Sequence, residues 1–445
     1  MRPDRPRAPV AIVGGGFSGT MLAAQLARRG ISSLLIEGGR RAGLGTAFST
    51  EEPAHVLNVR AEGMSAWPEQ PDHFARVSGD PRGFAGRRLF GRYLRDILDE
   101  AVASGRVEVI SSKVVAATPK SDDWELGLED GSAVTARAVA LAIGNQPPES
   151  LGIAAAAGVR FINNPWSEDA KAAVREAAAS GGDVLLVGTG LTMIDAVLSL
   201  GAEGHQGRIV ALSRRGQIPK AHADFEAAPV DKGEVPRGDV LALWRWLRRR
   251  SGQVGWRAAV DSLRPHSQAL WQSLGVEQQR RFLRHARPWW DVHRHRIAPE
   301  VARQVHDLVA EGRMEIEAGR IGSIREVDDG LEVEIRRRGE GQSFDKLRTS
   351  GLSRFAFAIN CTGPLGTIER TSDAMLRGLL DDGLVRADPL GIGLDVDQTS
   401  RAVGSDRLWA LGPLTKGRYW EIVAVPDIRA QAAQVADDIA KELKA

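Results

Sequence analysis

The clearest chemical signal in the sequence is a glycine-rich turn close to its first residue. The turn consists of Gly14, Gly16, Phe17, Ser18 and Gly19. Here Gly14 permits a tight turn, Gly16 lets the backbone approach a diphosphate, and Gly19 lets a following helix pack closely on a preceding strand. The N-terminus of that helix offers free N–H groups and a positive dipole end to phosphates. The turn therefore predicts a dinucleotide-binding site.

The segments around this turn have the order that such a site needs. Pro9 to Val13 is an apolar run typical of a buried parallel strand. Thr20 to Arg29 is rich in helix formers and is followed by Gly30, a helix stop. The strand predicted for Ser33 to Ile36 ends at Glu37, whose carboxylate can accept hydrogen bonds from ribose hydroxyls. Strand, turn, helix, strand and acid in this order favour a ligand site over a purely structural turn.

The first site is better suited to FAD than to a nicotinamide cofactor. A glycine-rich segment continues beyond Glu37, from Gly43 to Ser49, and another polar and apolar stretch runs from His55 to Arg60. A long continuation of this kind suits an extended cofactor that reaches past the first strand–helix unit. We therefore interpret the first turn as the seat of the FAD diphosphate.

A second turn of the same kind follows in the middle of the chain. Asp183 to Val187 is another predicted buried strand, and the residues after it are Gly188, Thr189, Gly190, Leu191 and Thr192. Met193 replaces the third glycine, and a larger residue there holds the helix farther from the strand. The repeat predicts a second dinucleotide site.

The residues after the next strand indicate which dinucleotide this second site takes. The strand predicted for Arg208 to Leu212 is followed by Ser213, Arg214 and Arg215 in place of an acid. Guanidinium groups at this position favour the 2′-phosphate of NADP over the 2′-hydroxyl of NAD. The alternative is that both arginines are ordinary surface residues.

Both units close in the same way, which fixes the predicted fold. An alternating hairpin precedes an apolar strand ending at Gly144 in the first unit, and the same pattern ends at Gly363 in the second. A glycine at a strand end lets the backbone pass close to a cofactor. The predicted fold is α/β, with two nested Rossmann-like domains and a mainly helical insertion. The predicted division is an FAD-binding domain from residues 1–160 and 355–445 and an NAD(P)-binding domain from 161–354.

Two insertions interrupt the second unit. Residues from about 225 to 300 carry six of the eleven tryptophans and are helical by composition, with Asp239 as a candidate helix cap. Tryptophans at helical spacing pack a core more often than they bind a ligand. We expect this insertion to cover the active-site cleft. Gly341 to Gly351 is polar and rich in turn residues, which predicts an exposed insertion within a hairpin.

Composition narrows the function. A formal net charge of +2 on 445 residues indicates neither a nucleic-acid nor a membrane partner. The single cysteine, Cys361, cannot form the redox pair that a disulfide reductase needs. The polar, proline-rich first ten residues do not resemble a secretory signal, so we expect a cytoplasmic protein. No histidine cluster has the spacing of a metal site.

The chain resembles the bacterial FAD/NAD(P)-binding oxidoreductases, a group related to flavin monooxygenases and amine N-hydroxylases. The segments that carry the resemblance span nearly the whole chain. They are Ala11 to Thr20, Leu57 to Val59, Met64 to Ala66, Gly188 to Thr192, Trp290 to Arg296, Ala387 to Gly391, Gly412 to Thr415, Trp420 to Ile422 and Val425 to Arg429.

The resemblance implies an FAD domain built from both ends of the chain, with the NAD(P) domain inserted between them. A last helix beginning near Asp427 and Ile428 would point its N-terminus at the flavin, where it would stabilise negative charge on the reduced ring. The resemblance also assigns residues to the FAD site. These are Asn58, Met64 and Ser65 beside the flavin, Val115 beside the adenine, Gly412 near the final strand, and Lys416, Arg418, Tyr419 and Trp420 along the cleft.

These features predict an FAD-dependent oxidoreductase that NADPH reduces and that uses oxygen, as monooxygenases do, on a small molecule. A flavin- or NADP-binding sensor without turnover and an oxygen-independent flavin reductase remain alternatives. Catalytic residues are indicated only by the cluster of His293, His295 and Arg296, which could bind an anionic substrate or NADP phosphates. The alternative for this cluster is a charged helix face.

Overall fold

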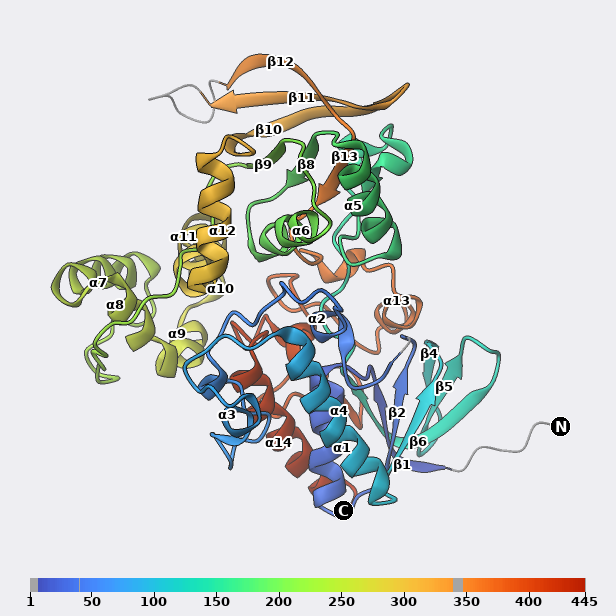
Figure 1. Ribbon diagram of the computed structural model, residues 1–445. Coiled ribbons are helices and arrows are strands. Elements are labelled where there is room, and N and C mark those ends of the chain that lie inside the picture. Colours follow the sequence, from blue (N-terminus) through green and yellow to red (C-terminus); the bar gives the residue numbers. More distant parts are fainter. Residues whose placement is uncertain (1–6, 40, 339–346, 445) are drawn as a thin grey trace.

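The computed structural model describes residues 7–39, 41–338 and 347–444. These residues form two seven-stranded sheets, each covered by helices, and a separate group of helices beside them (Figure 1). The predicted α/β class with two Rossmann-like units is confirmed. None of the described helices combines the length and apolar composition needed to span a lipid bilayer.

The first sheet has the strand order β3-β2-β1-β6-β5-β4, and β14 pairs with β6. Strands β1, β2, β3, β6 and β14 run parallel, whereas β4 and β5 form an antiparallel extension. The strands are β1 Ala8–Val13, β2 Ser33–Glu37, β3 Val107–Ser111, β4 Val114–Pro119, β5 Trp124–Leu128, β6 Ala133–Leu141 and β14 Leu408–Ala410. The helices around it are α1 Phe17–Arg28, α2 Gly45–Phe48, α3 His73–Ser78, α4 Arg87–Ala103, α13 Ala374–Asp381 and α14 Val425–Glu442.

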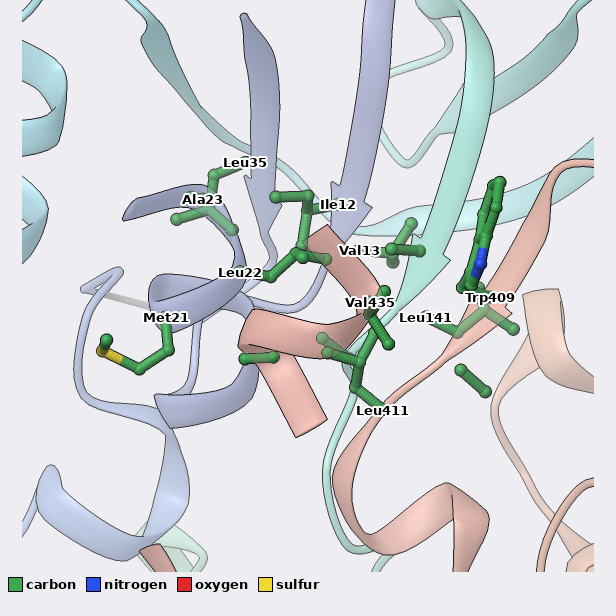
Figure 2. Close-up of a cluster of buried hydrophobic side chains, with 14 of the residues drawn as sticks. Ile12, Val13, Met21, Leu22, Ala23, Leu35, Leu141, Trp409, Leu411 and Val435 are labelled. Carbon is green, nitrogen blue, oxygen red and sulfur yellow. The ribbon is translucent and has the colours of Figure 1, made fainter. Parts of the chain in front are cut away.

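The end of the chain completes this first domain. Strand β14 pairs in parallel with the end of β6, and α14 packs against α1. Figure 2 shows the result, a core in which side chains of β1, α1 and β2 meet Trp409, Leu411 and Val435 from the C-terminal segment. Since Trp409 and Val435 are fully buried, this segment is part of the domain's core and not an appendage.

The second sheet has the order β12-β11-β10-β9-β8-β13-β7. Strands β7 to β10 and β13 run parallel, and β10, β11 and β12 form an antiparallel meander that crosses the top of the view in Figure 1. The strands are β7 Phe161–Ile162, β8 Val184–Val187, β9 Ile209–Ser213, β10 Met314–Val327, β11 Gly330–Arg338, β12 Leu347–Phe355 and β13 Phe357–Asn360. Its helices are α5 Glu168–Ser180, α6 Leu191–Ala202 and α12 Pro299–Ala310.

Two sequence-based expectations need correction here. The predicted division gave residues 355–445 to the FAD-binding domain, but β13 pairs with β7 and β8 of the second sheet. We therefore propose that the division falls after Asn360. Part of the segment predicted as an exposed insertion, from residue 347 onward, forms β12 and pairs with β11. Residues 339–346 of that segment lie outside the described residues.

The helical insertion is confirmed between β9 and α12. Its helices are α7 Val240–Val254, α8 Trp256–Ser262, α9 Ser267–Ser273, α10 Val276–Arg281 and α11 Arg287–Arg294. The Asp239 carboxylate accepts a hydrogen bond from Leu241 N, as the predicted helix cap requires. The residues from 225 to 239 precede the first of these helices and form loops and turns. Most of the buried side chains here are apolar and form a core of their own.

A buried ion pair joins the two nucleotide-binding domains. Arg87, at the start of α4, donates two hydrogen bonds to the Asp195 carboxylate in α6, of 3.0 and 2.8 Å. Both side chains are largely buried. Nearby, His55 Nε2 lies 3.0 Å from the carbonyl oxygen of the same Asp195 and 3.1 Å from Ser199 Oγ. The two domains are therefore held together by polar contacts that water does not readily reach.

Candidate dinucleotide sites

The first glycine turn has the conformation that a dinucleotide site needs. Gly14 has a φ of +103°, and a side chain there would bring its Cβ to 2.6 Å from the carbonyl oxygen of Ala142. A Cβ on Gly19 would collide with the carbonyl oxygen of Gly14, so α1 starts directly over β1. Both glycines are therefore required by close backbone approach, as predicted. This cradle fits the diphosphate that the sequence predicts.

The N-terminus of α1 is open to a ligand. Its first residue is Phe17, the preceding Gly16 is extended, and no side chain caps the helix. The Glu37 carboxylate accepts hydrogen bonds of 2.6 Å from Gly15 N and from Gly39 N. Glu37 therefore stands beside the turn at the end of β2, where it both holds the backbone and can meet a ribose.

Gly412 brings the C-terminal segment onto the same turn. It has a φ of +63°, and a Cβ there would lie 2.6 Å from Ser18 Oγ. Its N–H donates to Gln431 Oε1 over 2.8 Å, and Gln431 Nε2 in turn donates to Ser400 and Thr415. This buried network fixes Gly412 against the start of α1. The structure thus brings together Ser18 and Gly412, residues almost four hundred positions apart.

The loop containing Asn58, Met64 and Ser65 lies beside this region. The Ser65 hydroxyl is engaged within the loop, since it donates to Gln70 O over 2.6 Å. The Ser65 carbonyl accepts a hydrogen bond of 2.6 Å from Arg429 in α14. Met64 is buried, and Asn58 O accepts from His222 Nε2 over 3.0 Å. The loop is therefore fixed to α14 and to the loop preceding the insertion.

The second glycine turn repeats the geometry of the first. Gly188 has a φ of +117°, and a Cβ there would collide with the carbonyl oxygen of Cys361. Gly190 is extended and precedes α6, whose first residues, Leu191 and Thr192, are half-buried and whose N-terminus has no side-chain cap. Met193, in the place of the third glycine, is fully buried. The second turn therefore offers an open helix N-terminus for phosphates in spite of that substitution.

Two guanidiniums stand at the end of β9 beside this turn. The Ser213 hydroxyl accepts hydrogen bonds from Thr189 Oγ1 and from Gly216 N, which ties the strand end to the glycine turn. Arg214 is exposed and Arg215 half-buried, and among the described residues neither has an ion-pair partner. Burial, followed by the charge of Arg214, lowers the pKa of Arg215. Two close cations without a counter-charge fit the 2′-phosphate of NADP.

The remaining predicted residues are two glycines in the segments that follow β6 and β13 and one valine in an edge strand of the first sheet. Gly144 and Gly363 both have positive φ and open space where a Cβ would stand, just after the strands that close each unit. Val115 is half-buried in β4, the last strand of its sheet in the order above. Their roles in cofactor binding remain predictions.

Polar groups gather where α14 begins. Lys416 Nζ donates to Asn145 Oδ1 over 2.8 Å, which joins the C-terminal segment to the linker after Gly144. Burial, followed by the charge of Arg287, lowers the pKa of Lys416 to about 8. Asp427, in the first turn of α14 before the buried Ile428, has its pKa raised by burial. This helix starts at Val425, as the resemblance implied.

His293, His295 and Arg296 contact different partners and do not form one common site. The Arg296 guanidinium forms an ion pair with Asp261, and its Nε donates to His293 O. The His293 ring packs edge-on against Trp256, while burial lowers the pKa of His295, which lies 3.9 Å from Asp291. These contacts give the cluster a role within the insertion. Its catalytic role stays a prediction.

Sequence reasoning missed the residue that ties the insertion to α14. Glu421 is buried with a φ of +69°, and its carboxylate accepts from Trp290 Nε1 over 2.5 Å and from Arg294 Nε over 3.1 Å. It also missed Asn145 and Gln431. Their partners are far away in sequence, and nothing in the local pattern indicates them.

Comparison with known proteins agrees with this geometry. A sequence profile described as FAD-NAD(P)-binding matches residues 11–146. No curated protein sequence matches the chain.

Three solved structures share the fold over nearly the whole chain. An ornithine N-hydroxylase from Kutzneria sp. 744, in complex with reduced FAD, NADP⁺ and L-ornithine, is 15% identical, with 98% of this chain and 100% of that chain covered and a TM-score of 0.67. An L-lysine 6-monooxygenase from Pseudomonas syringae is 16% identical, with 98% and 99% covered and a TM-score of 0.65. A Lactococcus lactis thioredoxin reductase is 14% identical, with 98% and 99% covered and a TM-score of 0.55.

At these identities the similarity shows the fold alone. The expected ligands are inferred from the glycine turns of this chain. The profile covers the end of β1, the first turn, Glu37 and Gly144, which are the parts that the geometry assigns to the first nucleotide. Residues 11–146 of this chain therefore contain an FAD-NAD(P)-binding domain, and the chain as a whole shares its fold with these three structures.

Proposed function

We propose that the protein is an FAD-dependent oxidoreductase that NADPH reduces and that uses oxygen to oxidise a small molecule. The observation that carries the proposal is the pair of glycine turns. Each turn leads into a helix whose N-terminus has no side-chain cap, and each lies against the residues that directly follow β6 or β13. When bound, FAD would supply the redox chemistry that couples NADPH and the substrate, both oxidised, to oxygen, which is reduced.

The chain's own residues bind and orient both cofactors. The amides at the start of α1 and the close approach of Gly412 hold the FAD diphosphate, and Glu37 binds the ribose. The amides at the start of α6 hold the NADP diphosphate, while Arg214 and Arg215 bind its 2′-phosphate. The N-terminus of α14 would place its positive dipole end near the flavin, where it would favour the anionic reduced ring.

The presence of a single cysteine favours oxygen chemistry over disulfide reduction. Cys361 is the only cysteine in the sequence, and it is buried. Burial raises its pKa far above the ordinary range, so it is not a nucleophilic thiolate at neutral pH. A reductase that works through a cysteine pair is therefore not compatible with this chain.

The test is NADPH oxidation by the purified, FAD-reconstituted protein with and without oxygen. We expect yellow protein whose flavin is bleached by NADPH anaerobically and recovers its colour on admission of air. Anaerobic bleaching without recovery would favour an oxygen-independent reductase. Bound flavin that NADPH leaves oxidised would favour a sensor, and a protein that retains no flavin would refute the proposal.

The arginines after β9 provide a separate test of cofactor choice. In Arg215→Ala we expect KM for NADPH to rise about 10- to 100-fold, because a charge-assisted contact to phosphate contributes roughly 1.5–3 kcal/mol. KM for NADH should change by less than about twofold. Arg175→Ala, an exposed arginine on α5, is the matched control. Equal losses for both nucleotides in Arg215→Ala would contradict the assignment of the 2′-phosphate.

A further inference from the structure

A pocket lies at the edge of the first sheet that is opposite the first glycine turn. It has a volume of about 390 Å³ and is open to solvent. Its lining includes Ala8, the first residue of β1, Ser32, which precedes β2, and Arg106, which precedes β3. Because these strands run parallel and the turn follows the carboxyl end of β1, the pocket lies at their amino ends, roughly 20 Å from the turn. The pocket is therefore separate from both dinucleotide sites.

Three arginines line this pocket, and no acidic residue in the described part of the chain does so. Arg7, Arg106 and Arg137 come from three separate segments that folding brings together. Arg7 forms an ion pair with Asp123, whereas neither Arg106 nor Arg137 has an ion-pair partner among the described residues. The pocket therefore contains two cations whose charge is not neutralised by an ion pair.

Both of these guanidiniums are held at the wall of the pocket. Arg106 Nη1 donates to Gly30 O over 2.9 Å, and Arg137 Nη1 lies 3.5 Å from Leu443 O. Gly30 and Leu443 line the pocket themselves. A guanidinium carries five N–H donors, so a contact with one carbonyl leaves most of them available to a ligand.

The contacts with these carbonyls leave the pocket positively charged. Gly30 and Leu443 follow the ends of α1 and α14, where the helix dipole supplies roughly half a unit of negative charge at each end. Each guanidinium carries a full positive charge. The carboxylate of Glu442, the residue before Leu443, is already paired with Arg401 and Arg407. An anion bound in the pocket would therefore be attracted by an excess of positive charge.

We propose that this pocket binds a small polyanion, an oxyanion with at least two negative charges, which pairs with both Arg106 and Arg137 and accepts a hydrogen bond from the Ser32 hydroxyl. Guanidinium groups bind phosphate and carboxylate oxygens through paired N–H donors. The pocket volume falls within the range of ~300–1,000 Å³ that small-molecule sites have. Since the pocket shares no residue with the proposed cofactor sites, this inference does not depend on the proposed function.

The test is calorimetric titration of the FAD-loaded protein with pyrophosphate at low salt. Arg106→Gln and Arg137→Gln are each expected to raise the dissociation constant about tenfold, because each removes a charge-assisted contact. Arg92→Gln, at an exposed position on α4 of the same domain, is the matched control and should leave the dissociation constant unchanged. Pyrophosphate bound at the second glycine turn would not respond to the first two substitutions.

A second pair of variants tests the charge without removing either arginine. Ser32→Glu places a carboxylate in the pocket, whereas Ser32→Gln has nearly the same size and no charge. We expect Ser32→Glu to weaken pyrophosphate binding about tenfold more than Ser32→Gln does, because its carboxylate competes for the guanidiniums. In the ligand-free protein, Ser32→Glu should unfold at a higher temperature than Ser32→Gln for the same reason.

Citrate, which carries a similar charge on carboxylates, distinguishes the two sources of such an anion. Tighter binding of pyrophosphate assigns the pocket to phosphates, and tighter binding of citrate assigns it to carboxylates. The inference would be overturned if neither anion binds, if neither Arg106→Gln nor Arg137→Gln weakens binding, or if Ser32→Glu and Ser32→Gln lose equal affinity. A protein that retains no flavin would refute the proposed function, and the same titration of that protein would still test this pocket.

Discussion

At Gly14 the backbone leaves no room for a side chain. Gly14→Ala would combine an unfavourable positive φ, which costs about 1–3 kcal/mol, with a Cβ pressed against the Ala142 carbonyl. We expect FAD affinity to fall at least tenfold and the unfolding midpoint to drop. The measurement is the ratio of flavin to protein absorbance after gel filtration, together with thermal unfolding.

The matched control for this substitution is Gly30→Ala. Gly30 also has a positive φ, of +75°, but nothing lies within 4 Å of the position where its Cβ would stand. It therefore reproduces the backbone strain without the close approach. If Gly30→Ala loses as much FAD as Gly14→Ala, steric approach at the turn is not what holds the cofactor.

His222 makes stability depend on pH. Burial lowers its pKa to about 4, and its ring N–H donates to Asn58 O, in the loop that the resemblance assigns to the flavin. Because the unfolded chain binds the proton near pH 6.5, the folded state binds fewer protons between pH 6.5 and 4. The stabilisation is complete above about pH 6.5 and is lost as the pH falls through this window.

We expect the free energy of unfolding to decline between pH 6.5 and 4 by an amount on the order of 2 kcal/mol from this residue. Urea unfolding at several pH values measures the decline. His222→Gln should flatten it, whereas His306→Gln, at an exposed position on α12, should not. An identical pH profile in the wild type and in His222→Gln would show that His222 is not the titrating group.

At the scale of elements, α14 is held to the first glycine turn through Gln431. Gln431→Met removes the acceptor of the buried Gly412 N–H, and an unpaired buried donor costs about 1–3 kcal/mol. We expect a lower unfolding midpoint and weaker FAD binding, measured by thermal unfolding and by flavin titration of the apoprotein. Gln434→Met, at an exposed position on the same helix, should have little effect on either. Normal flavin binding by Gln431→Met would mean that Gly412 keeps its place without this network.

The elements themselves were largely predictable from local pattern. Both strand–turn–helix units and the helical insertion follow from apolar periodicity, glycine and composition, which act within a few residues, whereas the start of α14 was implied by the family resemblance. The errors have non-local causes. Strand β13 pairs with β8, whose partner residues lie far earlier in the chain, so its sheet could not be read from its own composition. Strand β12 is polar and was taken for a loop, because pairing with β11 overrides its weak propensity.

The residues of the candidate sites likewise fall into two groups, those that the local sequence predicts and those that it does not. Gly14, Gly19 and Gly188 were identifiable because a glycine motif implies a backbone conformation. The contacts of Glu421 and Gln431 depend on segments that meet only after folding, and no spacing in the sequence encodes them.

At the scale of the whole molecule, Arg87 and Asp195 join the two domains. Asp195→Asn leaves a buried guanidinium without its counter-charge, a change that costs roughly 3–5 kcal/mol. We expect the single unfolding transition to separate into two, as followed by calorimetry. Asp381→Asn, in an exposed pair within α13, should leave a single transition. A single, unshifted transition in Asp195→Asn would mean that apolar packing alone couples the domains.

The pairing of β14 with β6 also sets an order of events during synthesis. The ribosome releases the strands of the second sheet, through Asn360, before it has made β14 and α14. The second domain can therefore fold on the nascent chain while the first still lacks its last strand and the helix that covers its core. The first nucleotide can be captured in its final site only after β14 and α14 have emerged from the ribosome, so its binding should follow the folding of the second domain.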